Sequence, residues 1–224
     1  MALNISKPVD SARSELSKYG ILLLTDADLP SVCGIVGGEP IRGSWWGHPR
    51  GKEIFAVAES LSDDPDVMMV KLISGKATFV DRRLWPALLR IATSGEAWQT
   101  NGITSIAKAI LKKVNDDGTV RSDELAGIVD SSAKEIAESV RQLENKLRVY
   151  SEQVHTQGGA HAKALESWAR WSNRNGIESL NLTVQEAKRV FEDIVSEMNV
   201  RFSARAKLPW MTLERATKSK SSDP

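Results

Sequence analysis

One stretch of this chain, residues 103–164, limits its fold more than any other, because its polar and apolar residues follow a fixed order of patterns. We expect an amphipathic helix over 104–114, since apolar residues recur at every fourth position there. A short extended piece, 119–120, comes next, and Ser122 is expected to cap a second helix that ends near Val129. The segment then continues with a third helix and a hairpin.

The third helix of this stretch has the clearest start. Ser132 and Glu135 match a capping box, in which each side chain accepts a hydrogen bond from a free backbone N–H. The helix is expected to run to about Lys146, with an apolar face made of Ile136, Val140, Leu143 and Leu147. Two extended segments, 147–155 and 160–165, follow and enclose a turn. Helix, short strand, helix, helix and hairpin is the order of a winged-helix domain, which we therefore predict here.

The residue patterns in the first half of the chain predict a mixture of helices and strands. Its expected elements are a helix over 11–24, a helix over 51–62, strands over 67–73 and 77–80, and a helix over 83–93. The two strands are joined by a short turn and form a hairpin. Pro86 fits the last helix only if it lies in the first turn, where its missing N–H costs nothing.

Taken together, the patterns predict the α+β class: an N-terminal helix plus an α-β-β-α unit, followed by a winged-helix domain and a C-terminal helix. We expect an α+β domain with a Gly/Trp-rich loop over 1–100, the winged helix over 101–170, and a C-terminal helix with a basic tail over 171–224. Thr183 and Glu186 form a second capping box, which opens this last helix.

Composition and charge restrict the function classes. The formal net charge is +1, so any binding of nucleic acid has to come from local patches. A single cysteine, Cys33, excludes an intramolecular disulfide. The first residues lack the apolar core of a signal peptide, and no run approaches the roughly 20 apolar residues that span a bilayer. We therefore expect a cytoplasmic protein with no membrane partner.

The loop over 42–52 is the strongest candidate for a functional site. It places several polar groups just before a helix, whose free N–H groups favour phosphate: Arg42, His48, Arg50 and Lys52. Trp45 and Trp46 point in opposite directions if the chain is extended there, so that one enters the core and the other stays exposed. An exposed Trp46 would stack on a base, a contact worth roughly 1–3 kcal/mol. In the alternative interpretation the loop is structural and both tryptophans fill the core.

The helix expected over residues 132–146 is the second candidate for a functional site. In a winged-helix domain, the third helix is the one that enters the major groove of DNA. Its expected contacts to nucleic acid are Arg141, Gln142, Asn145, Lys146 and, just beyond, Arg148. Glu135, Glu138 and Glu144 reduce its positive charge. The pattern therefore also suits a winged helix that contacts protein or serves as a scaffold.

The histidines of the hairpin, His155 and His161, flank its turn and are counted among the expected nucleic-acid contacts. With His48 they suggest a three-histidine metal site, but the short ligand spacings typical of zinc are absent, so we predict no metal and no cofactor. A nuclease signature at Asp66 and Lys71 also fails, because Met69 stands where a carboxylate has to hold the metal.

Three segments carry a resemblance to known proteins. GSWWGHPRGKEIF (43–55), DVMMVKLISGKATFVDRRLWPALL (66–89) and VHTQGGAHAKALESW (154–168) resemble a bacterial family of uncharacterised proteins. That resemblance implies no activity and no functional residue. Residues 104–168 are also similar in outline to winged-helix DNA-repair proteins of the crosslink-glycosylase type, although no matching glycosylase motif is present.

These observations favour a DNA-binding protein that acts in DNA repair or regulation. Two alternatives remain open: an enzyme with a site between the Gly43–Lys52 loop and the wing histidines, and a protein-interaction module. DNA is the expected partner, and a homodimer or a protein partner is left open.

Overall fold

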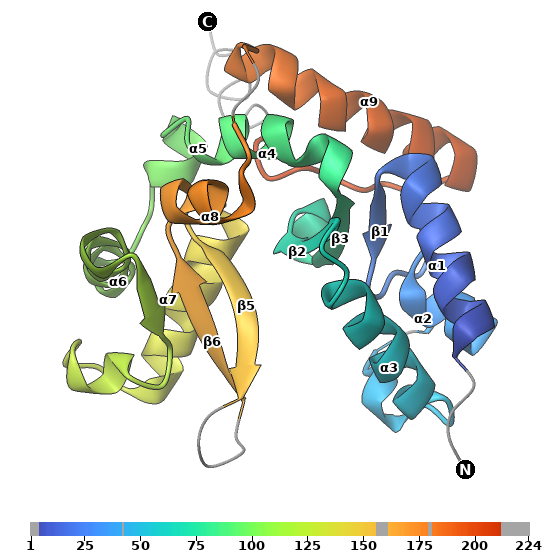
Figure 1. Ribbon diagram of the computed structural model, residues 1–224, viewed down its shortest axis with the longest axis horizontal. Coiled ribbons are helices and arrows are strands. Elements are labelled where there is room, and N and C mark those ends of the chain that lie inside the picture. The colour runs from blue at the N-terminus through green and yellow to red at the C-terminus, as the bar shows by residue number, and fades with distance from the viewer. Residues whose placement is uncertain (1–4, 42, 156–160, 179–180, 212–224) are drawn as a thin grey trace, which may run out of the picture. The chain divides into compact units, whose positions relative to one another are not determined.

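The computed structural model (Figure 1) describes residues 5–41, 43–155, 161–178 and 181–211. Helices and two small antiparallel sheets confirm the predicted α+β class. The chain divides into two compact units, and each is described by itself: the first holds 5–85 and 188–211, and the second holds the described part of 86–187. The domain boundaries predicted near residues 100 and 170 stay predictions.

The first unit contains a three-stranded antiparallel sheet. Its strands are β1 (Ile21–Leu23), β2 (Val67–Lys71) and β3 (Ala77–Asp81), in the order β1-β3-β2. Phe79 is in the central strand and pairs with Leu22 on one side and Met69 on the other. The predicted β2–β3 hairpin is therefore confirmed, and β1 adds a strand that the sequence did not predict.

The helix predicted over 11–24 is wrong at both ends. Helix α1 spans Ser6–Tyr19 and stops because Gly20 adopts a left-handed conformation, with φ of 77°, and donates its N–H to the carbonyl of Leu16. A side chain would also be strained there, since a Cβ on Gly20 would lie 2.7 Å from Cδ1 of Leu84, which would have to move. The apolar run that follows is the buried strand β1, not a continuation of the helix.

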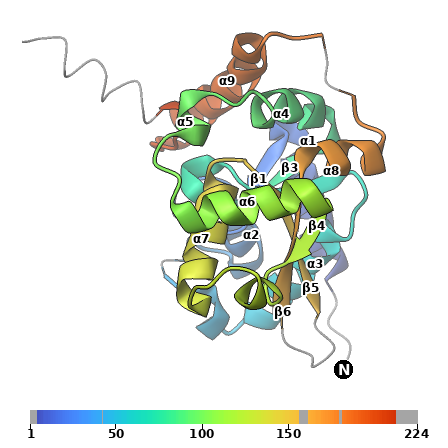
Figure 2. The same cartoon turned by 90° about the vertical axis from the view of Figure 1, so that its left-hand side faces the viewer.

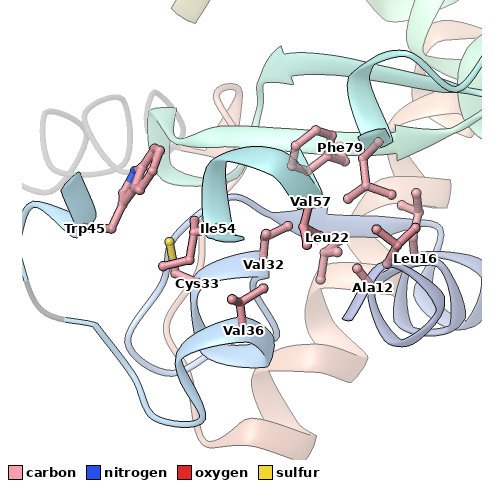
Figure 3. Close-up of a cluster of buried hydrophobic side chains, with 12 residues drawn as sticks. Ala12, Leu16, Leu22, Val32, Cys33, Val36, Trp45, Ile54, Val57 and Phe79 are labelled. Atoms are coloured by element: carbon pink, nitrogen blue, oxygen red, sulfur yellow. The ribbon is translucent and has the colours of Figure 1, made fainter. Parts of the chain in front are cut away.

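Helices α2 (Val32–Gly37) and α3 (Gly51–Ser62) pack with α1 and the sheet around one buried apolar cluster of the first unit. The bounds of α3 agree with the predicted helix over 51–62. Figure 3 shows the buried cluster that these elements share, with Trp45 at one end on the side of Cys33 and Ile54. The loop that carries the tryptophans is thus anchored directly in the core.

The second unit holds the elements predicted for residues 103–164, apart from one helix. The elements found in this segment are α6 (Ser105–Asp117), β4 (Thr119–Arg121), α7 (Ala133–Asn145), β5 (Tyr150–His155) and β6 (His161–Glu166). The strands form an antiparallel sheet in the order β4-β6-β5. Figures 1 and 2 together show α6 and α7 crossing steeply. The winged-helix assignment itself stays a prediction.

The second helix, predicted from Ser122 to Val129, is wrong: only a short 3-10 turn, η4 (Leu125–Gly127), is present there. The reason is a contact to the hairpin. The Ser122 hydroxyl accepts the backbone N–H of Lys163 at 2.9 Å, and the Ser122 N–H is donated to the carbonyl of Lys163 at 2.8 Å. Ser122 thus extends the sheet and does not cap a helix.

Unlike the single cap predicted at Ser122, the two capping boxes were predicted correctly. The Ser132–Glu135 capping box opens α7 as predicted. Thr183 and Glu186 likewise exchange hydrogen bonds at the start of α9 (Val184–Phe202). The 3-10 turn η3 (Arg82–Leu84) leads into α4 (Trp85–Ala92), which holds Pro86 in its first turn, and the remaining helices are α5 (Ala97–Thr100) and α8 (Trp168–Asn175).

The tryptophans outside the 42–52 loop pack in the interior: Trp85, Trp98, Trp168, Trp171 and Trp210 are all buried. Their indole N–H groups have acceptors; that of Trp168, for example, is donated to the carbonyl of Leu147 at 2.8 Å. In the part of the chain that the structure describes, no helix combines the length and the apolar character that a membrane span needs.

Candidate nucleic-acid interface

The two adjacent tryptophans lie in a 3-10 turn, η1 (Trp45–Gly47), and differ sharply in exposure. Trp45 is 9% exposed and belongs to the core, whereas Trp46 is 67% exposed. This division matches one of the two interpretations left open by the sequence, but the geometry differs from the extended chain assumed there. The turn stacks the two indoles, with centroids 4.1 Å apart and planes inclined by 22°, so the rings lie against each other and do not point apart.

Phe55 extends the aromatic surface from the second turn of α3. Its ring centroid lies 5.8 Å from that of Trp46, and its side chain is 38% exposed. We call Trp46 and Phe55 the aromatic ledge. Because the buried Trp45 supports one of its rings, the ledge is an apolar surface with a fixed orientation.

The turn below the ledge is tightly built. The backbone N–H of His48 is donated to the carbonyl of Trp45 at 3.0 Å, and that of Gly51 is donated to the carbonyl of His48 at 2.8 Å. A Cβ on Gly51 would lie 3.2 Å from the carbonyl oxygens of both Trp45 and Trp46. Glycine at this position therefore permits the close approach of α3 to the tryptophan turn.

The cations of this loop are not equally available. Nε and a terminal nitrogen of Arg50 both bond Oε2 of Glu53, which raises the pKa of Arg50 and lowers that of Glu53. The Glu53 carboxylate also lies in the first turn of α3, where the helix dipole favours an anion. Lys52 is exposed. Arg42, also predicted as a contact, lies outside the described residues.

Of the three histidines, only His48 has a side chain within the described part of the structure. Nδ1 of His48 accepts the backbone N–H of Arg50 at 3.1 Å, so this ring helps to hold the loop. His155 and His161 pair across the hairpin, but their side chains lie outside the described residues. Among the described residues, no group of three or more potential ligands is arranged to hold a metal ion. An enzymatic site at these histidines stays a prediction.

On α7, two of the predicted contacts are engaged with backbone. The side chain of Gln142 accepts the N–H of Thr104 and donates to the carbonyl of Gly102. The Lys146 ammonium donates to the carbonyls of Trp98 and Asn101, both at 2.8 Å, and burial lowers its pKa. Both residues therefore tie the segment before α6 to α7.

The other three contacts predicted on this side also differ in exposure. Arg141 is exposed and pairs with Glu138 at 2.9 Å. Asn145 and Arg148 are half-buried, and burial lowers the pKa of Arg148. Oδ1 of Asn145 and Nε of Arg148 are buried without a hydrogen-bond partner among the described residues. Of the contacts predicted on this helix, Arg141 is thus the best placed to meet a ligand at the surface.

The sequence missed a buried carboxylate between α7 and the hairpin. Glu144 is 5% exposed, and its Oε1 accepts hydrogen bonds from the Ser151 hydroxyl and the Lys163 ammonium. A signal was available, because Glu144 lies eight residues after Ile136 and so falls on the apolar face of the helix.

A small pocket lies on the face of the β4-β6-β5 sheet that points away from Glu144 and α7. Its volume is about 240 Å³, and it is lined in part by Tyr150, Glu166 and Arg174. Arg174 pairs with Glu166 at 2.8 Å. Burial raises the pKa of Tyr150 to about 12. The charged groups that line this pocket are therefore already matched with each other.

Comparison with known proteins gives one assignment. The model of a family described as AlkZ related matches residues 7–207. The chain belongs to the AlkZ-related family. No curated protein and no solved structure matches it. Membership agrees with the resemblance to an uncharacterised family, whereas the likeness to winged-helix repair proteins stays a prediction.

Proposed function

We propose that this AlkZ-related protein binds DNA, with the aromatic ledge stacking on an unpaired base and the second unit acting as a winged helix on the duplex. The observation that carries the proposal is Trp46, an indole that is 67% exposed and yet stacked on a buried neighbour. An exposed indole that is held in place and adjoins a second aromatic ring offers a flat apolar surface on which a base can stack.

Stacking suits this geometry because little side-chain freedom is left to lose on binding. Trp45 already holds one side of Trp46, so a base can stack on the ring without first ordering it. Such a contact is worth roughly 1–3 kcal/mol and tolerates any base. Lys52, exposed in the first turn of α3, supplies a cation for a neighbouring phosphate.

Two further observations support DNA as the ligand. The order α6, β4, α7, β5, β6, with β4 paired to β6, matches the arrangement expected of a winged helix except that the 3-10 turn η4 stands in place of its second helix. The family description supplies a link to DNA repair. The exposed side of α7 has Lys134 and Arg141 but also Glu135 and Glu138, so we expect α7 alone to bind weakly.

Fluorescence titration with single-stranded DNA tests the ledge. We expect Trp46→Ala to weaken binding roughly tenfold to a hundredfold, which corresponds to the loss of one stacked base. Trp46→Tyr keeps an aromatic ring and should retain most of the affinity. Trp46→Leu keeps only apolar character and should not. Val200→Ala, which alters an apolar side chain that is 82% exposed, is the control and should have no effect.

The exposed ledge also favours a second function, contact with a protein partner. The same titration distinguishes DNA binding from contact with a protein partner. If the unmodified protein fails to bind single-stranded or duplex DNA even at low salt, the DNA proposal is wrong and the ledge is better explained as a protein contact. Equal affinities for the Trp46→Leu and Trp46→Tyr variants would likewise exclude base stacking.

A further inference from the structure

Three cationic side chains from distant parts of the sequence meet where α1 ends. Nζ of Lys18 lies 4.7 Å from the centroid of the Tyr19 ring, and Cζ of Arg201 lies 5.9 Å from the same centroid. A terminal nitrogen of Arg83 lies 3.2 Å from the position that a Cβ on Gly20 would occupy. We call Lys18, Arg83 and Arg201 the Tyr19 cluster; all three belong to the first unit.

Packed aromatic rings support this cluster. Tyr19 is 6% exposed and meets the ring of Phe202 edge to face, with centroids 5.8 Å apart. Arg201 also lies 5.9 Å from the Phe202 ring. Cation–π contacts of this kind contribute about 0.5–1 kcal/mol at exposed sites and restrict where the cations lie. The cluster is thus set on a rigid base.

The charges of the cluster are poorly balanced by acids. Lys18 and Arg201 are exposed, and among the described residues no carboxylate lies within ion-pair distance of either. The Asp81 carboxylate lies 3.8 Å from Arg83. By contrast, Lys76 in the same unit has a carboxylate at 2.7 Å. The Tyr19 cluster therefore presents net positive charge to solvent.

We infer that the Tyr19 cluster binds the phosphodiester backbone of DNA. Guanidinium and ammonium groups donate strong hydrogen bonds to phosphate oxygens. Because Lys18 and Arg201 are both exposed, they form an open surface, which suits a polymer with repeated charges better than a small enclosed anion. The inference rests on the proposed function, since that function supplies DNA as the polyanion, and it adds a contact surface separate from the aromatic ledge.

A simpler account of the same residues has to be tested as well. Lys18 lies in the last turn of α1 and Arg201 in the last turn of α9. The C-terminus of a helix attracts cations, so these side chains would be favoured there without any ligand. On that account their removal lowers stability and leaves DNA binding unchanged. The experiment therefore measures thermal unfolding and DNA binding on the same variants.

The test is the salt dependence of binding by the full chain to a short labelled duplex. Each phosphate contact that is lost lowers the slope of log affinity against log salt by roughly 0.9. We expect the slope of the double variant Lys18→Gln/Arg201→Gln to fall by roughly 1–2. The charge-preserving variants Lys18→Arg and Arg201→Lys should keep the slope. Lys76→Gln, whose cation already has a carboxylate partner, should also keep it.

An unchanged slope in the folded double variant overturns the inference. So does binding to phosphatidylserine vesicles that depends on the cluster while DNA binding does not. If the double variant fails to fold, Lys18→Gln alone decides the question, with an expected loss of roughly 0.9 in slope. The ledge is tested independently, since Trp46→Ala should lower affinity for unpaired bases with no change in slope. The ledge contact and the cluster contact can therefore fail separately, whereas a protein that binds no DNA at all would remove both.

Discussion

The indole of Trp46 lies on the indole of Trp45, with ring centroids 4.1 Å apart. Trp45 in turn is part of the buried cluster formed by α1, α2, α3 and the sheet. The orientation of an exposed side chain is therefore set by the core of the first unit. Changes to the packing beneath the turn should alter the ledge even when Trp46 itself is untouched.

Gly51→Ala should disturb this turn. The new Cβ would lie 3.2 Å from two carbonyl oxygens, of Trp45 and Trp46, so the turn or the start of α3 has to shift. Overpacking of this kind costs about 1–3 kcal/mol, which urea unfolding would measure, and tryptophan emission should change as the ring stack moves. Gly47→Ala is the matched control, because nothing lies within 4 Å of its Cβ. Equal effects of the two substitutions would contradict this account.

Lys146→Met should act on stability first. The ammonium donates to the carbonyls of Trp98 and Asn101, and the substitution leaves both without this partner. We expect the free energy of unfolding to fall by about 1–3 kcal/mol. Lys134→Met, on the exposed side of the same helix, should leave it nearly unchanged. A loss of DNA affinity at unaltered stability would instead support the sequence-based role of Lys146 as a DNA contact.

Local signals predicted the parts of the fold that depend on neighbours in sequence. The Ser132–Glu135 and Thr183–Glu186 capping boxes were correct because each is closed within one turn of helix. The two helix predictions that were wrong, over 21–24 and from Ser122 to Val129, concern segments whose structure depends on contacts with residues remote in the sequence. The run Ile21–Leu23 becomes a strand because β3 pairs with it, and Ser122 pairs with Lys163 of the hairpin. Both partners are remote in the sequence.

The candidate site was predictable to a similar degree. The argument that separated Trp45 from Trp46 assumed an extended chain, whereas both their exposures and their stacking depend on the 3-10 turn that holds them. The backbone partners of Gln142 and Lys146 lie 40 to 48 residues away in the sequence, so these hydrogen bonds could not be predicted from the helix alone. The role of both residues as DNA contacts stays a prediction. The Tyr19 cluster likewise joins three separate segments and has no signature in any one of them.

Acid should weaken the first unit through Asp26. Its Oδ1 accepts the N–H groups of Asp28 and Leu29, and its Oδ2 accepts the Lys76 ammonium at 2.7 Å. Burial alone would raise the pKa of Asp26, but these hydrogen bonds outweigh burial and lower it. The ionised form is thus favoured by folding, and its contribution is present above the unfolded pKa, about 3.9, and lost as pH falls through the lower folded value.

The corresponding variant is Asp26→Asn. At neutral pH it should reduce the free energy of unfolding by about 1–2 kcal/mol, since it weakens hydrogen bonds to a charged group. The difference from the unmodified protein should narrow below about pH 4, where the unfolded Asp26 becomes protonated. Urea unfolding across this range measures both effects, and Asp28→Asn at an exposed position is the control. A difference that stays constant with pH would argue against a role for the charge.

The buried carboxylate of Glu144 connects α7 to the hairpin. It accepts the Ser151 hydroxyl at 2.6 Å and the ammonium of Lys163, whose own side chain is 42% exposed. Lys163→Met should destabilise the protein, because it leaves a buried charge with one partner fewer. Breaking a fully buried pair costs roughly 3–5 kcal/mol, and we expect about 2 kcal/mol here because solvent reaches Lys163.

Removing both charges should behave differently. In Glu144→Leu/Lys163→Met no buried carboxylate remains, so its desolvation cost disappears together with the attraction that offset it. We expect the double variant to be nearly as stable as the unmodified protein, and more stable than Lys163→Met alone. Urea unfolding of the complete double-mutant cycle measures the coupling directly. If the two single losses simply add, the pair does not act as a unit, and the Glu144 contact does not hold the hairpin against α7.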